Sequence, residues 1–327
     1  MIGPSRILFA AVLAALALAG PAGADGSLTP KEVKLTQPAP WGDTAERGYA
    51  VLLPPNLKPE ERVPAIVLLH DAGDDPLAAV YRHGWIATAS QAHFALVAPA
   101  AGPQAQGRAE GGFFNAKVWN AGTPGAAAWA DAAFLAAVAK DIVAKQPIDP
   151  ARIYLVGFGE GGAMAQRVLI EAPGRFAAIA SVGGPLYQVP DTVKTPRPLL
   201  LMQGLADPTN PAYGGAVYTP WAGPGMRSSL QDQATAWSAA LGCGRSAIAP
   251  PPEGAPADGG TVTRWDWSGC VDPGALRVIW VSGLGRQWPG TGAGPLPARI
   301  AGPANDAIFA PWEIWRFFED RSIQAKP

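Results

Sequence analysis

The 327-residue chain has little cysteine, little histidine, almost no net charge and no N-terminal apolar run long enough to span a membrane. With 25 basic and 26 acidic residues the net charge is −1, which argues against nucleic acid or an anionic membrane surface as a partner. The apolar stretch at residues 7–19 is shorter than the about 20 residues that cross a bilayer.

The first 24 residues have the layout of a secretory signal peptide. Arg6 provides a positive charge, the apolar stretch at 7–19 follows, and Ala22-Gly23-Ala24 offers small residues for cleavage. We expect cleavage near Ala24 and a secreted or periplasmic protein with no membrane contact afterwards. An uncleaved membrane anchor is the alternative.

The chain has two cysteines, Cys243 and Cys270. In the oxidising compartment that an exported protein reaches, two cysteines this close together predict a disulfide. Closing such a loop stabilises a fold by about 3–4 kcal/mol in the chain-entropy view. The spacing fits no zinc pattern and no histidine lies near, so we expect no metal and no other cofactor.

Apolar runs alternate with helical segments along the rest of the chain, which predicts an α/β fold. Strands that are apolar throughout suit a mainly parallel sheet covered by helices on both faces. We expect one domain over residues 48–320, an irregular segment at 25–47 before it and a tail at 321–327 after it. The expected strands are 48–53, 64–70, 94–98, 152–156, 176–182, 198–203, 262–267 and 276–281. The expected helices are 77–92, 126–145, one ending near residue 171, 228–241 and 305–318, and the stretches 204–225, 249–260 and 289–303 are expected to be surface loops.

A strand, a glycine-rich turn and a helix follow one another around Gly157-Phe158-Gly159-Glu160-Gly161. This is the context of the nucleophile elbow Gly-x-Ser-x-Gly, in which a sharp turn presents a nucleophile above the sheet. In this chain Gly159 stands at the nucleophile position, and glycine has no side chain that could attack a substrate.

Motifs over roughly residues 48–320 resemble secreted polyhydroxybutyrate depolymerases and feruloyl esterases of the α/β-hydrolase fold. They are Trp119-Asn-Ala-Gly122, the helix around Asp131, Ile148–Tyr154, the elbow with Gly161-Gly162, Arg175–Ala180, Gly204–Pro208, Leu241–Cys243 and Trp288–Gly290. The resemblance implies an α/β-hydrolase fold, a carboxylic ester hydrolase activity and a Ser-His-Asp triad.

This resemblance places two substitutions in the triad. Asp207 matches the triad acid, but Arg286 stands in Gly283–Gly290 where the family has its histidine. Arginine cannot replace a histidine base, because its pKa stays above about 12.

The order of residues along the chain leads to the same conclusion. In α/β-hydrolases the histidine follows the nucleophile and the acid. The three histidines of this chain are His70, His83 and His93, and all precede the elbow. A triad in the usual order is therefore impossible.

Backbone N–H groups could still form an oxyanion hole, with candidate positions at Asp71, Ala72 and Glu160. Asp71 and Glu160 would then bring carboxylates close to it, which opposes the build-up of negative charge there. The alternative is that both are solvated, with Glu160 complementing the helix N-terminus. We also expect Arg286 to form a bidentate salt bridge with Asp207, joined by Glu160, in the former triad site.

Four aromatic residues are candidates for the walls of an inherited pocket, with core packing as the alternative: Phe113, Phe114, Trp119 and Trp288. The leading hypothesis is a pseudoenzyme that binds a small-molecule or polymeric ester or carboxylate ligand. A second is an ester hydrolase with a non-standard site built on Asp207, Glu160 or Asp71. A third is a purely structural or partner-binding role.

Overall fold

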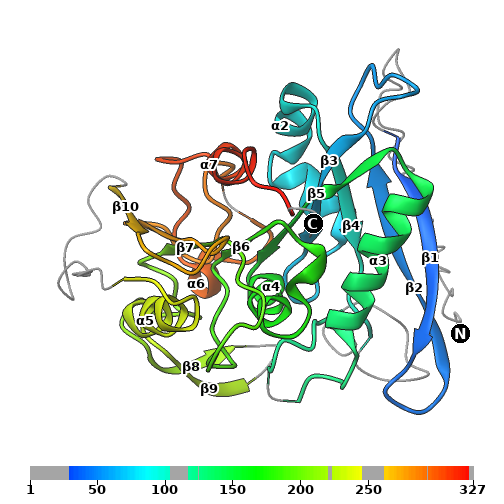
Figure 1. Ribbon diagram of the computed structural model, residues 1–327. Helices are drawn as coiled ribbons and strands as arrows, with labels where there is room; N and C mark the ends of the chain where they lie inside the picture. The colour runs from blue at the N-terminus through cyan, green and yellow to red at the C-terminus, as the bar shows by residue number, and fades with distance from the viewer. Residues whose placement is uncertain are drawn as a thin grey trace, which may run out of the picture.

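A nine-stranded sheet forms the centre of the protein (Figure 1). The computed structural model describes residues 29–103, 117–123, 125–219, 223–244, 261–292 and 294–323. The strand order is β1-β2-β4-β3-β5-β6-β7-β11-β10, parallel from β4 to β11 and antiparallel towards both edges. The strands are β1 Lys31–Pro38, β2 Thr44–Leu52, β3 Val63–Leu69, β4 Ala95–Pro99, β5 Ile148–Phe158, β6 Ala178–Val182, β7 Leu199–Gly204, β10 Val262–Trp267 and β11 Leu276–Val281.

Helices cover both faces of this sheet, so the expected α/β architecture is confirmed. One core lies under α3, α4 and α5, and the other under α1, α2 and α7 (Figure 1). The central strands are buried along their whole length because both of their faces meet helices. The helices are α1 Pro76–Arg82, α2 Trp85–Ala92, α3 Asp131–Lys145, α4 Glu160–Glu171, α5 Leu230–Ala240, α6 Ala298–Ala301 and α7 Ala310–Phe318, with a 3₁₀ turn at Pro173–Arg175.

The expectation of an irregular segment at 25–47 is wrong. Strand β1 lies inside it and pairs along its full length with β2 at the edge of the sheet. Val33 and Leu35 pack against the core while the intervening side chains face solvent. This alternation of period two is the pattern of a half-buried edge strand.

Three further segments differ from expectation, and one of them is the stretch 289–303, an expected loop that contains helix α6. The stretch 77–92 forms two helices instead of one, because the chain turns at His83 and Gly84, where Gly84 adopts φ +75°. The stretch 204–225, expected to be a loop, contains most of a separate hairpin formed by β8 Gly215–Thr219 and β9 Gly223–Arg227.

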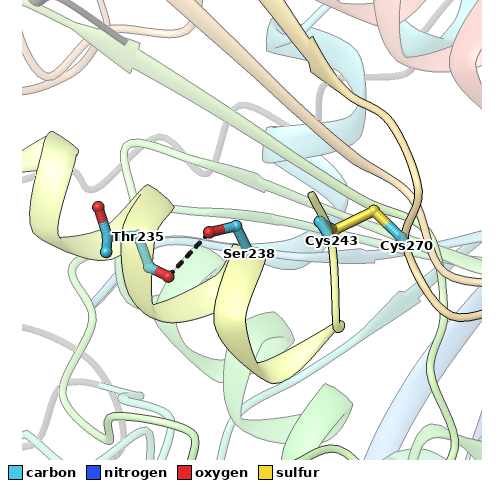
Figure 2. The surroundings of a disulfide bond; sticks show 4 residues. All are labelled: Thr235, Ser238, Cys243 and Cys270. Carbon is cyan, nitrogen blue, oxygen red and sulfur yellow. Dashed lines mark hydrogen bonds between the residues drawn. A yellow bond between two sulfur atoms is a disulfide. The ribbon is translucent and has the colours of Figure 1, made fainter. Parts of the chain in front are cut away.

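The predicted disulfide between Cys243 and Cys270 is present (Figure 2). Cys243 follows the C-terminal end of α5, and Cys270 lies in the connection between β10 and β11. The bond therefore ties a covering helix to the edge of the sheet.

In the parts of the chain that the structure describes, no helix has both the length and the apolar character needed to cross a membrane. The expected signal peptide at residues 1–24 lies outside the described residues.

Candidate functional site

The backbone keeps the sharp strand-to-helix turn between β5 and α4. Gly159 at its apex has φ +54° and ψ −117°, a conformation that strains any residue with a Cβ atom. The turn is fixed by backbone packing on both sides. A Cβ at Gly157 would overlap the backbone of Gly161, and one at Gly161 would overlap the carbonyl groups of Leu69 and His70.

Two of the three candidate oxyanion-hole N–H groups, those of Glu160 and Ala72, bind the carboxylate of Asp71. The backbone N–H of Glu160 donates to Asp71 Oδ1 at 2.9 Å, and the N–H of Ala72 donates to the same oxygen at 2.7 Å. The position in which an esterase would stabilise the oxyanion of its intermediate therefore holds a negatively charged oxygen of the chain itself.

Arg286 holds this carboxylate from the other side. Its Nε donates to Asp71 Oδ2 at 3.0 Å and its Nη2 donates to Oδ1, so the pair is bidentate, and its Nη1 donates to Thr209 Oγ1 at 3.0 Å. The side chains of Arg286 and Asp71 are 2% and 10% exposed. Burial alone lowers the pKa of Arg286, but the carboxylates of Asp71 and Asp207 outweigh it and raise the pKa above its ordinary value.

Gly159, the Asp71 carboxylate and the Arg286 guanidinium fit one another. A Cβ at Gly159 would overlap both the Asp71 carboxylate and the Arg286 guanidinium. A serine at position 159 therefore cannot coexist with the observed positions of the other two side chains.

Asp207 lies in the turn after β7 and is held by its own loop. Its Oδ1 accepts hydrogen bonds from the Thr209 N–H, the Thr209 hydroxyl and the Asn210 N–H at 2.8, 2.8 and 3.1 Å. Its Oδ2 is buried and has no hydrogen-bond partner in the described part of the chain. Burial raises the pKa of Asp207 against the opposing attraction of Arg286.

The expected bidentate pair of Arg286 with Asp207 is therefore wrong. Arg286 makes its bidentate pair with Asp71. Thr209 lies between Arg286 and Asp207, since its hydroxyl accepts from Arg286 and donates to Asp207. The turn that follows Asp207 already satisfies one of its oxygens, whereas Asp71 projects from the loop after β3 towards the guanidinium.

The alternative that Asp71 and Glu160 are solvated is also wrong, because both are buried, and Glu160 is held by two hydroxyl groups. The Thr123 hydroxyl donates to its Oε2 at 2.6 Å and the Tyr187 hydroxyl donates to its Oε1 at 2.8 Å. Burial, and next the charge of Glu160, raise the pKa of Tyr187, so the phenol stays protonated and able to donate.

A cavity of about 250 Å³ lies against this ion pair. Asp71 and Arg286 form part of its wall, together with Phe158, His83 and Trp288. The ring of His83 stacks on Trp288 with centroids 4.4 Å apart and an interplanar angle of 8°. Burial, and next the charge of Arg82, lower the pKa of His83 to about 3, so its imidazole is neutral near pH 7.

Only part of the predicted aromatic wall belongs to this cavity. Trp288 lines it, whereas Trp119 lies in the core and its indole N–H donates to the carbonyl of His70 at 3.0 Å. Phe113 and Phe114 lie outside the described residues.

Several residues of the cavity were not predicted from the sequence, Arg82 and His83 among them. Both stand where α1 ends, next to Gly84, and a glycine just past a helical pattern is a signal for a helix end that could have found them.

The described residues contain no group of three or more potential metal ligands. They also place no nucleophilic side chain at the apex of the elbow. The site as built holds the Asp71 carboxylate on the backbone N–H groups of Glu160 and Ala72.

Four features define the fold class of this protein. They are a mainly parallel sheet, a sharp turn after its central strand β5, an acid after β7 and a polar residue after β11. The protein has the α/β-hydrolase fold. Residues 47–193 match the family model described as esterase PHB depolymerase.

Known proteins resemble this chain over different lengths. NocK of Nocardia uniformis subsp. tsuyamanensis, classed provisionally as an esterase, is 38% identical over 184 residues, which cover 53% of this chain and 52% of NocK. The chain thus matches about half the length of this curated relative. An acetyl xylan esterase from Aspergillus awamori is 14% identical with a TM-score of 0.49, covering 78% of this chain and 94% of that one. An S-formylglutathione hydrolase from Agrobacterium tumefaciens is 16% identical with a TM-score of 0.44, covering 55% and 77%.

Proposed function

We propose that this protein is a non-catalytic relative of esterases that binds a ligand in the cavity beside the former active site. The observation that carries the proposal is the Asp71 carboxylate on both oxyanion-hole N–H groups, locked there by Arg286.

Three requirements of ester hydrolysis are unmet at once. Gly159 supplies no nucleophile, and the loss of a nucleophile alone costs about 10⁶ in kcat in a serine hydrolase. Arg286 cannot accept a proton. The Asp71 carboxylate would repel the developing oxyanion, and even the loss of one hole donor costs about 10²–10³.

The alternative of a carboxylate-based hydrolase has no observation in its favour. Both oxygens of Glu160 are hydrogen-bonded, and the residue is buried away from the cavity lining. Asp207 is 2% exposed, and Asp71 is engaged by Arg286.

The cavity supports binding of a small group. At about 250 Å³ it lies just below the range of about 300–1,000 Å³ usual for drug-sized ligands. It would therefore hold a small ester-like molecule or the end of a polymer chain between Trp288, Phe158 and the rim residues Pro295 and Leu296.

The first test is hydrolysis of a short-chain nitrophenyl ester and of methyl ferulate by the oxidised mature protein. The variants Asp207→Ala and Glu160→Gln run in parallel. We expect no turnover above that of the variants. Turnover that disappears in either variant would overturn the proposal in favour of a carboxylate-based mechanism.

The second test is calorimetric titration with methyl ferulate. Leu296→Trp narrows the cavity and should weaken binding, whereas Val189→Trp, at a position that is 63% exposed and outside the cavity lining, should not. Binding that is absent in the wild type, or unchanged by Leu296→Trp, would contradict a ligand role for this cavity.

We propose in addition that the protein is exported and loses residues 1–24. The disulfide supports an oxidising compartment. The test is cell fractionation with N-terminal sequencing of the mature chain, which should begin near Asp25. A full-length cytoplasmic protein with free thiols would contradict it.

A further inference from the structure

Four N–H donors from three separate segments converge on one small volume. They are Nε and Nη2 of Arg286 after β11, the backbone N–H of Glu160 at the elbow and the backbone N–H of Ala72 after β3. A planar guanidinium together with a backbone donor at a helix N-terminus, here that of Glu160, is an arrangement that proteins use to hold carboxylates. Here the carboxylate that they hold belongs to the chain.

We propose that this volume is a carboxylate-binding site whose resident ligand is Asp71. Asp71 thereby acts as a specificity-determining residue that closes the inherited pocket to external carboxylates. The inference extends the proposed function, because it states which ligands the adjoining cavity rejects.

The geometry supports this role in two ways. Asp71 and Arg286 both line the cavity of about 250 Å³, so removal of the Asp71 side chain would open a path from that cavity to the four donors. Asp71 also competes from within the same chain, and an intramolecular ligand has a high effective concentration against any dissolved anion.

The other charged residues of the cavity also disfavour the binding of an external anion. Asp74 also lines it and is held by Arg82, whose Nη1 and Nη2 donate to the two Asp74 oxygens at 2.8 and 3.1 Å. With both arginines engaged by acids, the described lining of the wild-type cavity offers no uncompensated positive charge to an anion. A neutral ester or alcohol meets no such barrier.

The experiment uses the full mature protein and compares benzoate with benzyl alcohol, two probes that share a ring. In Asp71→Ala we expect benzoate to bind at least about tenfold more tightly than it binds wild type. Formate should also raise the melting temperature of Asp71→Ala saturably, while chloride at the same ionic strength should not. Wild type should show neither effect.

Two further variants test whether the gain in carboxylate binding depends on position 71 and on the Arg286 guanidinium. Asp74→Ala frees only the guanidinium of Arg82 and leaves Asp71 on the four donors, so it should gain clearly less formate-specific stabilisation than Asp71→Ala. In Asp71→Ala combined with Arg286→Gln the gain should be lost, because the guanidinium fork is gone. If Asp71→Ala does not fold alone, its refolding yield in formate against chloride provides the same readout.

The outcomes separate this inference from the proposed function. Wild type that binds benzoate as tightly as Asp71→Ala, or Asp71→Ala that responds to no carboxylate, would overturn the inference; the second result would follow if Arg286 turned to Asp207. Wild type that binds neither methyl ferulate nor benzyl alcohol while Asp71→Ala binds benzoate would defeat the proposed function and leave the inference in place.

Discussion

The side chains of Asp71 and Arg286 fill the volume into which a serine at position 159 would project. Glycine at the apex has two consequences, since it removes the nucleophile and makes room for the carboxylate. The ion pair in turn neutralises a charge that would otherwise be buried alone, a situation that costs several kcal/mol. The three positions are therefore coupled, and changing one alone should be unfavourable.

We expect Gly159→Ser to lower the free energy of unfolding by about 2–4 kcal/mol. The cost combines backbone strain at φ +54° with overlap against Asp71 and Arg286. Urea unfolding measures it. The matched control is Gly292→Ser, where φ is +78° but no atom lies within 4 Å of an added Cβ, and where we expect a loss of only about 1 kcal/mol. Equal losses at the two sites would show that the overlap contributes nothing.

Esterase activity should return only when all three positions change together. The double variant Gly159→Ser with Arg286→His leaves the Asp71 carboxylate on the oxyanion donors and should stay at the wild-type background. Addition of Asp71→Gly frees those donors, and a histidine at 286 could donate to the unpartnered Oδ2 of Asp207. We expect at least about tenfold more nitrophenyl ester hydrolysis from the triple variant.

Adding Asp207→Ala to the triple variant should abolish that gain. Activity in the double variant equal to that of the triple variant would show that Asp71 does not obstruct the site.

The residues at the altered triad positions could be predicted from the sequence, but the ion-pair partner of Arg286 could not. The nucleophile-elbow motif placed Gly159 at the nucleophile position. Because no histidine follows Gly159 in the sequence, the usual histidine base is excluded. The choice of Asp71 over Asp207 by Arg286 depends on two loops 215 residues apart and on a turn that already binds one oxygen of Asp207. No local pattern encodes that competition.

At the scale of elements, buried strands were the most predictable and exposed ones the least. Strand β3 is apolar at every position because helices cover both of its faces. Strand β1 and the β8–β9 hairpin carry polar or small residues on an exposed side, so their sequences resemble loops. The break between α1 and α2 was hidden because helical residues continue on both sides of Gly84.

The disulfide is an element-scale restraint with a measurable effect. We expect Cys243→Ser with Cys270→Ser to lower the free energy of unfolding by about 3–4 kcal/mol, because the closed loop of 27 residues is released in the unfolded chain. Urea unfolding of the wild type in reductant should reproduce that loss, and reductant should not affect the double variant. A wild type insensitive to reductant would contradict the expectation.

For the whole molecule, buried neutral histidines should make stability fall in acid. Burial lowers the pKa of His83 to about 3 and lowers that of His70 as well, below the ordinary value of about 6.5 that they regain on unfolding. Between these values the unfolded chain binds more protons, so stability is full above about pH 6.5 and is lost as pH falls towards 3.

We expect His83→Phe to reduce by one the number of protons that the chain takes up on unfolding in acid, and so to weaken the dependence of stability on pH. The variant keeps a ring to stack on Trp288 and also removes a buried ring nitrogen that has no hydrogen-bond partner in the described chain. Between pH 7 and pH 4 it should lose roughly 2–4 kcal/mol less stability than wild type, measured by denaturant unfolding at each pH. Parallel curves would show that His83 does not titrate on unfolding.

The crowding of the elbow has a consequence for how this protein can be re-engineered. Gly157 and Gly161 touch neighbouring backbone with no space for a side chain, whereas the atoms that would meet a side chain at position 159 belong to two replaceable residues. A substitution library should therefore tolerate change at 71, 159 and 286 in combination and reject it at 157 and 161. A different reactive group can therefore be introduced at position 159, at the apex of the turn, while the backbone of the turn and the sheet stay unchanged.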